Sequence, residues 1–395
     1  MILFLISFLA IYGGLHIFAF IRLRRIVQPG PCTVQLLIIW MSVMTVVPLL
    51  VRLAEQFGSE VTARLVAWPG YLWMGFIFIF TSTLLISDLA RLCIRYLLLI
   101  FSIRVPEYIS SRTIGKIVLI VALGESCYAC YEASQIRSEH VVVTSSKLPS
   151  STVRVRIVQV SDIHIGLLLQ QKRLQRIVDK INAARPDILV STGDLVDGKL
   201  NRNDAISELD PRAALLAAVP APSGKFAVIG NHEVYAGLAQ AIAFSQASGF
   251  TILRNQYCTL PNGITISGID DKAVNPKLLD SPNTETALLN RIDSRSFNVF
   301  LKHRPDLVPE SDGKFDIQLS GHVHGGQIFP FNYLVRFKHS IPCGMTTTQT
   351  GSHMYVSRGT GTWGPPMRLF APPEITIIDI IPSTLHPTNR QNHSR

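Results

Sequence analysis

The chain has 395 residues, a length that as a soft prior corresponds to about two domains. Hydrophobic residues make up 48% of it and charged residues only 16%, and the apolar excess lies in the first third. The net charge is +10, but lysine and arginine are dispersed, so nucleic-acid binding is not indicated. In a membrane protein a basic balance instead reflects topology and anionic lipid.

Residues 1–133 are predicted to form a transmembrane region with about four helices, because each apolar segment is near the length that spans a bilayer. The first segment has no basic region before its apolar core, so it is a poor signal peptide. No cluster of buried charges marks a transport path, which favours a membrane anchor over a transporter. The predicted spans are Met1–Ile21, Thr33–Val51, Leu65–Ser87 and Ile117–Ala133.

Loop charges predict the orientation of these spans. Basic residues are concentrated after the first and third spans, whereas Glu55 and Glu60 offset the basic residues between the second and third. The positive-inside rule then places the N-terminus and the C-terminal domain outside the cytoplasm. The apolar stretch Tyr96–Ile103 is short and could be an interfacial helix; if it spans, the orientation is reversed.

The rest of the chain divides into a polar linker over 134–152, a soluble domain over 153–382 and a polar tail over 383–395 that is predicted to be disordered. Strands and helices alternate in the first half of the domain and strands dominate the second, which predicts an α/β domain of two packed sheets flanked by helices. The predicted helices are Gln170–Ala184, Asp204–Val219 and Gly237–Ser248. The predicted strands are Val153–Val160, Asp187–Ser191, Lys225–Ile229, Ile264–Ile269, Phe297–Lys302, Phe315–Leu319, Met354–Ser357 and Glu374–Ile380.

Five polar motifs each follow the end of a predicted strand, where ligands bind in α/β folds. Each motif alone is explained by a turn, a helix cap or a surface histidine. Together they place oxygen and imidazole ligands at five strand ends, with glycines where the backbone must turn. The motifs are Ser161-Asp162-Ile163-His164, Thr192-Gly193-Asp194-Leu195-Val196-Asp197, Gly230-Asn231-His232-Glu233, Lys302-His303-Arg304-Pro305 and Gly321-His322-Val323-His324-Gly325-Gly326-Gln327.

In this order the motifs resemble those of the calcineurin-like metallophosphoesterases, whose pattern D-x-H, G-D-x-x-D, G-N-H-[DE], H and G-H-x-H is complete between Val153 and Ile381. Gly321–Gln327 and the later stretch Ser357–Arg368 are most similar to the membrane-associated bacterial branch. The resemblance implies a sandwich of two packed mixed β-sheets flanked by helices. With the predicted spans, it implies a multi-pass protein of a bacterial inner membrane.

The resemblance also implies a site with two divalent metal ions. Mixed imidazole and oxygen ligands suit Mn, Zn or Fe better than Ca or Mg. His232 would be the catalytic residue that protonates the leaving oxygen or stabilises the transition state. Asp162, His164 and His324 would hold the first ion, Asn231, His303 and His322 the second, and Asp194 would bridge the two.

Some neighbouring roles stay open. Glu233 or Asp197 could orient nearby histidines, although Asp197 is equally well explained as a turn residue. Arg304 or Arg358 could contact a substrate phosphate or form a surface salt bridge. The six cysteines show no disulfide framework. The Cys127-Tyr128-Ala129-Cys130 spacing lacks a second ligand pair, so these two cysteines are interpreted as small apolar side chains, and Cys258 and Cys343 as structural.

These observations predict a membrane-anchored, dinuclear metal-dependent phosphoesterase that hydrolyses phosphodiester bonds by attack of a metal-activated hydroxide on phosphorus. Its location suggests a lipid-linked or envelope phosphoester as substrate. One alternative is a hydrolase of a nucleotide-linked lipid pyrophosphate of the UDP-diacylglucosamine type, which calls for a cytoplasmic face. Another is a non-catalytic membrane sensor or scaffold that retains the fold. Nothing in the sequence indicates an oligomeric state.

Overall fold

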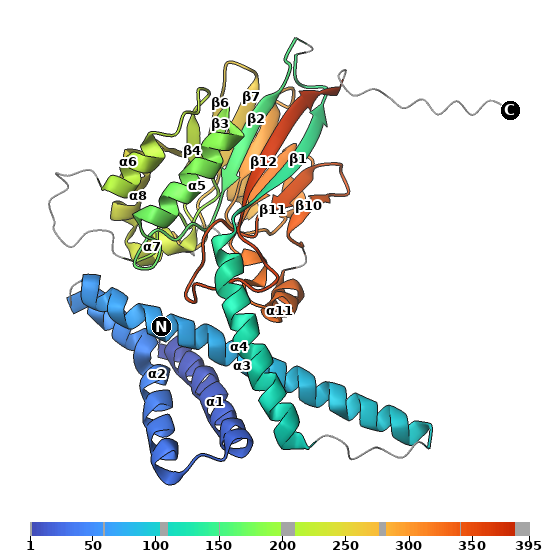
Figure 1. The fold of residues 1–395 in the computed structure, drawn as a ribbon. Coiled ribbons are helices and arrows are strands. Elements are labelled where there is room, and N and C mark those ends of the chain that lie inside the picture. The colour runs from blue at the N-terminus through green and yellow to red at the C-terminus, as the bar shows by residue number, and fades with distance from the viewer. Residues whose placement is uncertain are drawn as a thin grey trace. The chain divides into compact units, whose positions relative to one another are not determined.

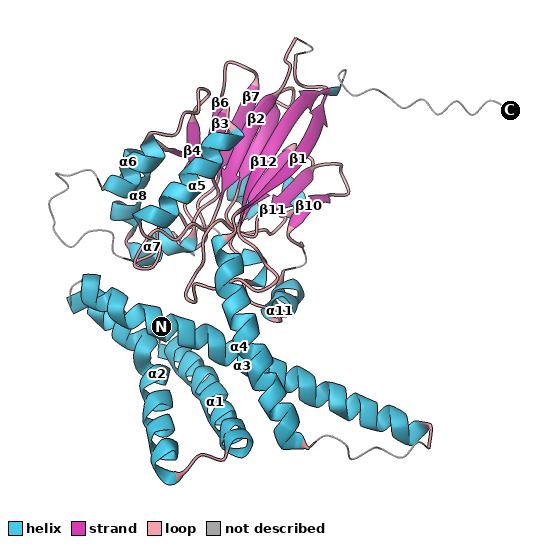
Figure 2. Cartoon of the chain, viewed as in Figure 1, coloured by secondary structure: helices cyan, strands magenta, loops and turns pink. Residues whose placement is uncertain are grey.

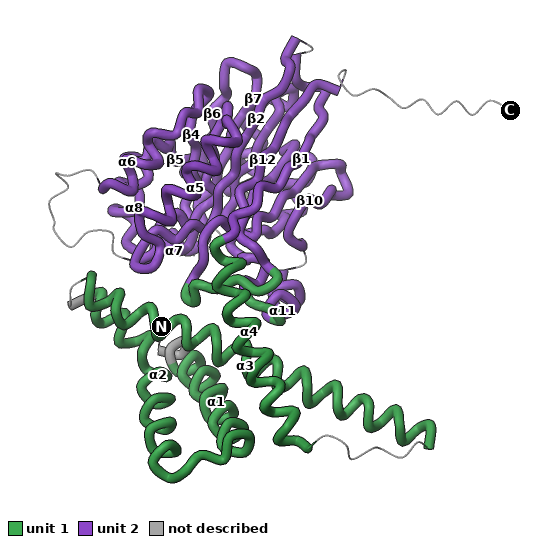
Figure 3. Tube along the Cα trace, in the orientation of Figure 1, with its two compact units in different colours: residues 1–134, 328–330, 364–370 green, residues 135–327, 331–363, 371–395 purple. Residues whose placement is uncertain are grey.

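The computed structural model describes residues 2–57, 60–102, 110–149, 151–198, 210–275, 282–339 and 341–383. The chain divides into two compact units, drawn in different colours in Figure 3. Unit 1 contains residues 1–134, 328–330 and 364–370, and unit 2 contains residues 135–327, 331–363 and 371–395. The tail predicted to be disordered lies outside the described residues from position 384 onward.

Unit 1 contains the four predicted apolar helices, each long and apolar enough to cross a membrane. They are α1 (Ile2–Val27), α2 (Pro31–Phe57), α3 (Glu60–Ile100) and α4 (Ser111–Ser134). Helix α3 has 41 residues and includes Tyr96–Ile100, so the first part of the stretch considered as a separate interfacial helix instead continues the third apolar helix, and Ile103 lies outside the described residues. Arg22 forms a bidentate ion pair with Asp88, with N–O distances of 2.6 and 3.0 Å, which joins α1 to α3.

Two short segments from the second half of the sequence belong to unit 1. Ile328, Met367 and Leu369 pack in the same buried apolar cluster as side chains of α1, α3 and α4. The two segments also pair with each other, because the Phe329 amide donates to the Leu369 carbonyl at 3.0 Å. Two segments that were expected in the soluble domain over 153–382 therefore belong to the helical unit: 328–330 and 364–370.

Unit 2 is built on two six-stranded mixed sheets (Figure 1). The first sheet has the order β1 (Arg137–Ser145), β12 (Glu374–Pro382), β2 (Val155–Val160), β3 (Ile188–Ser191), β4 (Lys225–Ala227) and β5 (Thr251–Ile252). The second has the order β10 (Gly344–Thr347), β11 (His353–Val356), β9 (Ile317–Ser320), β8 (Phe297–Leu301), β7 (Ile264–Gly268) and β6 (Gln256–Thr259). Strands β2 to β5 are mutually parallel, as are β7, β8, β9 and β11.

Side-chain alternation along the strands builds the core. In β2, Ile157 packs in the apolar cluster shared by the two sheets, whereas Val158 packs in the cluster that the first sheet shares with its helices. Leu174 and Ile177 of α5 recur at helical spacing and are fully buried in that second cluster. The helices on this face are α5 (Gln171–Ala184), α6 (Pro211–Ala217) and α8 (Leu238–Ala247) (Figure 2). The remaining short helices are α7 (Asn231–Ala236), α10 (Pro282–Leu289), η1 (Pro309–Ser311), η2 (His324–Gly326) and α11 (Phe331–Lys338). The predicted two-sheet α/β fold is therefore confirmed.

Several boundaries differ from the sequence-based expectation, and strands β5, β6 and β10 were not predicted. The linker predicted over 134–152 was wrong for Arg137–Ser145, which forms β1 and pairs in parallel with β12 along its whole length. The partner strand lies more than two hundred residues later in the sequence. The polar residues around β1 suggested a linker, and nothing local indicated this pairing. The helix expected from Asp204 is described only over Pro211–Ala217, and its first residues lie outside the described part of the chain.

Candidate metal centre

The predicted site residues all follow the carboxyl ends of parallel strands, either in a loop or at the start of a short helix. The parallel strands of each sheet end at one edge, so these loops meet. The first sheet contributes Asp162 and His164 after β2, Asp194 after β3, and Asn231 and His232 after β4. The second sheet contributes His303 after β8, and His322 and His324 after β9.

Asp162, His164 and His324 form one compact group of possible ligand atoms. One atom from each lies within 4.8 Å of the others, and all three side chains are buried. The Nε2 atoms of His164 and His324 are 3.0 Å apart, and His324 Nε2 is 3.5 Å from Asp162 Oδ1. These are the residues predicted to hold the first ion.

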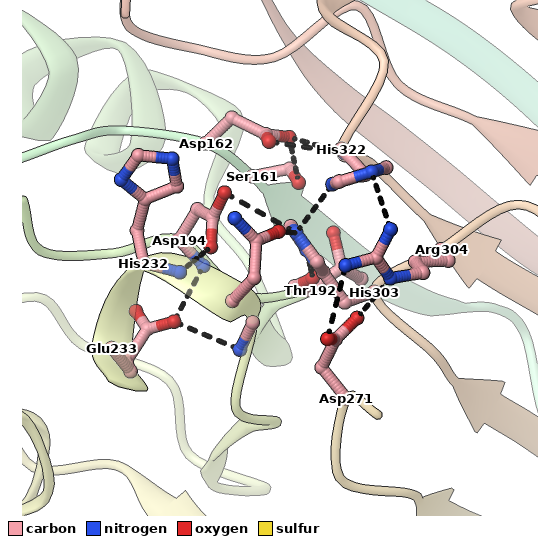
Figure 4. A network of polar contacts seen from close by, with 12 residues as sticks. Ser161, Asp162, Thr192, Asp194, His232, Glu233, Asp271, His303, Arg304 and His322 are labelled. Atoms are coloured by element: carbon pink, nitrogen blue, oxygen red, sulfur yellow. Dashed lines mark hydrogen bonds and ion pairs between the residues drawn. The ribbon is translucent and has the colours of Figure 1, made fainter. Parts of the chain in front are cut away.

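A second group contains Asp194, His303 and His322, again with ligand atoms within 4.8 Å of one another. His303 Nε2 is 3.2 Å from Asp194 Oδ2, 3.1 Å from Asn231 Oδ1 and 3.2 Å from His322 Nδ1 (Figure 4). Asp194 Oδ2 is also 3.9 Å from His164 Nε2. Asp194 therefore lies between the two groups, at the place expected of a bridging ligand.

The hydrogen bonds behind His303 orient its ring. Its Nδ1 donates to the Thr192 carbonyl at 2.8 Å, so Nε2 faces the oxygens of Asp194 and Asn231. Such a contact to a carbonyl fixes the tautomer that leaves a lone pair for a metal ion. The sequence did not single out Thr192 for this contact, which its backbone makes.

The electrostatics of the centre fit divalent cations. Burial raises the pKa of Asp162 to about 6, and burial lowers the pKa of His164 to about 4 and that of His322 to about 2. Burial alone would also lower the pKa of His303, but the nearby Asp194 charge outweighs it and raises that pKa to about 10. A protein interior tolerates carboxylates and imidazole lone pairs facing one another when a cation neutralises them. The residues present therefore suit metal ions.

The backbone of the centre is strained in a way that marks functional sites. Non-glycine residues seldom adopt positive φ, and the cost is sustained where the surroundings enforce it. Five of the candidate ligands do so: Asp162 (φ 51°), His164 (55°), Asp194 (52°), His322 (72°) and His324 (51°). Glycine is required beside them, because a Cβ on Gly321 would collide with the Asp162 carboxylate.

Glu233 holds two ligand loops together. Its buried carboxylate accepts hydrogen bonds from the backbone amides of Asp194 at 3.0 Å, Leu195 at 2.6 Å and Gly230 at 2.8 Å. Burial raises its pKa to about 7, and the charge of Asp194 adds to the shift. These hydrogen-bond donors are main-chain amides, so Glu233 orients the ligand loops and not a histidine ring.

His232 forms a pair with Asp197. His232 Nδ1 lies 3.0 Å from Asp197 Oδ1, which favours the orienting role for Asp197 over the simple turn. Burial alone would lower the pKa of His232, but the hydrogen bond to Asp197 and the surrounding carboxylates outweigh it and raise that pKa. The protonated imidazole is thereby stabilised. His164, Asp197 and His232 also form a third group within 4.8 Å, which shows how close the pair lies to the candidate ligands.

Two exposed aromatic rings flank His232 and were missed by the sequence analysis. The Tyr235 and Trp363 ring centroids lie 5.4 and 5.5 Å from that of His232. Tyr235 was detectable, since it is three residues from His232 on α7 and so lies on the same helical face. No local sequence pattern indicated that Trp363 would lie near His232. Trp363 is held by Gln327, whose side chain accepts from the Trp363 amide at 3.0 Å and donates to its carbonyl at 2.8 Å.

The two candidate arginines differ in position. Arg304 Nε donates to Asp271 at 2.7 Å, and its Nη1 lies 3.0 Å from His322 Nε2, so its guanidinium borders the second group (Figure 4). Arg358 is paired with Glu374 and Glu139 and supports the scaffold. Asp271 was missed although it follows the end of β7, where the strand-end argument would have found it.

Comparisons with known proteins agree with this geometry. The family model described as calcineurin-like phosphoesterase matches residues 155–326. An uncharacterized metallophosphoesterase of Aquifex aeolicus (strain VF5) is 35% identical over 263 residues, covering 66% of this chain and 98% of the relative. One of Bacillus subtilis (strain 168) is 35% identical, covering 66% of this chain and 91% of the relative. A "transmembrane protein with metallophosphoesterase domain" of Danio rerio is 30% identical, covering 66% of this chain and 61% of the relative.

Proposed function

Because the chain belongs to the calcineurin-like metallophosphoesterases, we propose that it is a membrane-anchored, dinuclear metal-dependent phosphoesterase that hydrolyses phosphodiester bonds. The observation that carries the proposal is the convergence of two groups of ligand atoms, with Asp194 between them. Asp162, His164 and His324 would hold one ion, Asn231, His303 and His322 would hold the other, and Asp194 would contribute to both. Mn, Zn or Fe bound there would supply an activated water and neutralise charge on the phosphoryl oxygens.

His232 acts as the general acid. Asp197 holds its Nδ1–H and stabilises the imidazolium, which leaves Nε2–H to donate a proton. As the oxygen of a hydroxide ion bonds to phosphorus and the bond to the leaving group breaks, this proton passes from His232 to the leaving oxygen. General acids of this kind contribute about 10²- to 10⁴-fold to the rate.

Arg304 binds a phosphoryl oxygen of the substrate. Its Nε is held by Asp271, and its Nη1 borders the second ligand group with part of the side chain exposed. A guanidinium fixed in this way offers several directed donors at small entropic cost. Asp271 is the positioning residue for this contact.

The four apolar helices support a substrate that is lipid-linked or otherwise held at the membrane. By the positive-inside rule, the loop charges support a catalytic unit outside the cytoplasm, and that location would suit an envelope phosphodiester. A reporter enzyme fused after Arg395 tests the orientation, since it should be active only outside the cytoplasm. Cytoplasmic activity would overturn that placement and favour the nucleotide-linked lipid pyrophosphate.

The decisive experiment combines metal analysis with a substrate panel. The full chain is purified, stripped with a chelator, reloaded with Mn, Zn or Fe and assayed on phosphomonoesters, phosphodiesters and lipid pyrophosphates. We expect two metal equivalents per chain and diester hydrolysis that chelation abolishes and reloading restores. One equivalent would refute the dinuclear site. Two equivalents without hydrolysis of any substrate would identify a sensor or scaffold.

A further inference from the structure

Helix α11 exposes an apolar surface that the fold of unit 2 leaves uncovered. None of its eight residues is buried. Phe337 is 95% exposed, Leu334 is 61% exposed and Tyr333 is 60% exposed. Soluble surfaces seldom expose large apolar side chains side by side, and such patches mark an interaction site.

The apolar residues of α11 are arranged on one side of the helix. At 100° per residue, Leu334 and Phe337 lie within about 60° of each other, and Arg336 lies about 160° from Leu334; Lys338 lies about 40° from Leu334, at the end of the helix, where its long side chain can reach the headgroups. The helix contains no acidic residue, and Arg336 and Lys338 are both exposed. An apolar face beside basic residues is the pattern of a helix that lies in the plane of an anionic membrane surface.

Chain connectivity identifies the partner as a lipid surface. The chain enters α11 at Phe331 directly from Pro330, the last residue of a segment that belongs to the unit of candidate membrane helices. That segment contributes Ile328 to the apolar cluster of those helices. One peptide bond therefore separates α11 from residues packed with the membrane helices, which favours the bilayer over a soluble protein.

The same helix is tied to the metal centre within unit 2. The metal loop is the segment Gly321–Gln327, which carries His322 and His324. Its Gly326 lies so close to the backbone of Asn332, near the start of α11, that any Cβ on Gly326 would collide with it. After the helix, the His339 ring lies 6.0 Å from the ring of His322, a candidate ligand. A helix held at both ends in this way cannot move far from the centre.

We propose that α11 is an interfacial helix that inserts Leu334 and Phe337 into the boundary between headgroups and acyl chains, with Arg336 and Lys338 at the anionic headgroups. The metal centre is then held at headgroup level, and the substrates it can reach are phosphoesters of lipid headgroups. The proposal rests on the membrane anchoring that is part of the proposed function.

The test measures the depth of nitroxide labels in the full chain, reconstituted in nanodiscs that contain anionic lipid. None of the six cysteines, which all lie in the described part of the chain, forms a disulfide, so they can be replaced before single cysteines are introduced. The three test variants are Leu334→Cys, Phe337→Cys and Arg336→Cys. Leu36→Cys reports on the anchor, because this residue of α2 is 67% exposed within a candidate span.

We expect the ratio of oxygen to nickel-chelate collisions to be roughly tenfold higher at positions 334 and 337 than at 336, as for apolar positions in an interfacial helix. High nickel collisions at all three positions would place α11 in water and overturn the proposal. Low collisions with both reagents at 334 and 337 would also overturn it, because a second copy or another protein would then cover the helix.

The label at position 36 separates this inference from the function on which it rests. If position 36 is lipid-exposed while the three α11 labels are in water, the interfacial helix is refuted and the anchor stands. If position 36 is itself in water, the membrane anchoring fails and the interfacial helix fails with it. All labelled positions are exposed, so the substitutions leave the core intact, and a thermal unfolding scan of each variant checks this.

Discussion

The two sheets of unit 2 contribute different chemistry to one site. The first sheet supplies every candidate oxygen ligand, from Asp162, Asp194 and Asn231, together with one imidazole. The second sheet supplies only imidazoles, from His303 and the two histidines of the metal loop. Negative charge thus comes from one sheet and neutral nitrogen from the other, so neither sheet alone can hold and neutralise a pair of divalent ions.

Hydrogen bonds across the site fix the imidazole ligands of the second sheet relative to the oxygen ligands of the first. The His322 amide, from the second sheet, donates to Asp162 Oδ1 of the first sheet at 3.0 Å. His303 Nδ1 donates in the same direction, to the Thr192 carbonyl. The imidazole half is therefore positioned by the oxygen half, and substitutions of the ligand residues that follow strands of the first sheet should disturb both ion sites.

The largest effect is expected for Asp194→Asn. The change removes the carboxylate between both ligand groups, so both ions should be lost and hydrolysis should fall by about 10⁴-fold, as for an essential member of a catalytic unit. Metal content by mass spectrometry and kcat/KM measure this. Asp293→Asn, at an exposed ion pair with Arg295, is the matched control. Retention of both ions in the Asp194 variant would contradict the bridging assignment.

His303→Ala tests the second sheet in the same assay. Among the described candidate ligands, His303 contacts Asp194, Asn231 and His322 of the second group, so we expect the loss of about one metal equivalent, retention of the other and a fall in kcat/KM of roughly 10³-fold. His303→Ala should therefore lose fewer metal equivalents than Asp194→Asn. Equal loss of metal in the two variants would show that the two groups do not bind ions separately.

His232→Ala should leave the metal content unchanged and lower kcat by about 100-fold. The loss should be largest for alkyl leaving groups, which need a proton, and smallest for p-nitrophenol. Asp197→Asn should show the same dependence on the leaving group with a smaller loss, because it weakens the imidazolium that Asp197 stabilises. A loss that is equal for all leaving groups would rule out the general-acid role.

The sequence predicted the members of this site better than their contacts. Asp162, His164 and the other ligand candidates were identifiable because each follows the end of an apolar strand and has a ligand side chain. The same logic should have included Asp271, which follows β7. Trp363 could not be found, because the loop that brings it to His232 is set by contacts between residues far apart in sequence.

The fold showed the same limit. Strands with strong apolar alternation, such as β2, were predicted within two or three residues, because alternation is a local signal. Strand β1 was missed, because its pairing partner β12 is supplied by the end of the domain. The transfer of 328–330 and 364–370 to the helical unit also depends on tertiary packing, which no local pattern encodes.

Arg304→Ala should have a moderate effect confined to substrate binding. Loss of one charge-assisted contact is worth about 1.4 kcal/mol, so we expect KM to rise about tenfold with metal content unchanged. Arg304→Lys should recover little of the substrate affinity that Arg304→Ala loses, since an ammonium cannot contact Asp271 and a phosphoryl oxygen in the same fork geometry. Arg295→Ala, at an arginine side chain that is 89% exposed, is the control. A change in metal content with Arg304→Ala would instead indicate a role in supporting His322.

The smallest effect on catalysis is expected for Asp379→Asn, which separates the scaffold of the first sheet from its chemistry. Asp379 on β12 forms a bidentate ion pair with Arg156 on β2, with both N–O distances 2.8 Å, and the hydrogen bond to Arg156 lowers the pKa of Asp379. A carboxyl group whose pKa is lowered by folding stabilises the protein above its unfolded pKa of about 3.9, and this stabilisation is lost as the pH falls through the folded value. We therefore expect the variant to unfold about 2–6 °C below the parent protein at pH 7, for a loss of about 1–2 kcal/mol, with the difference shrinking below about pH 4. Metal content and kcat should be unchanged, because the pair lies on strands and not in the ligand loops. A difference in unfolding temperature that persisted at low pH would show that the carboxylate charge is not the cause.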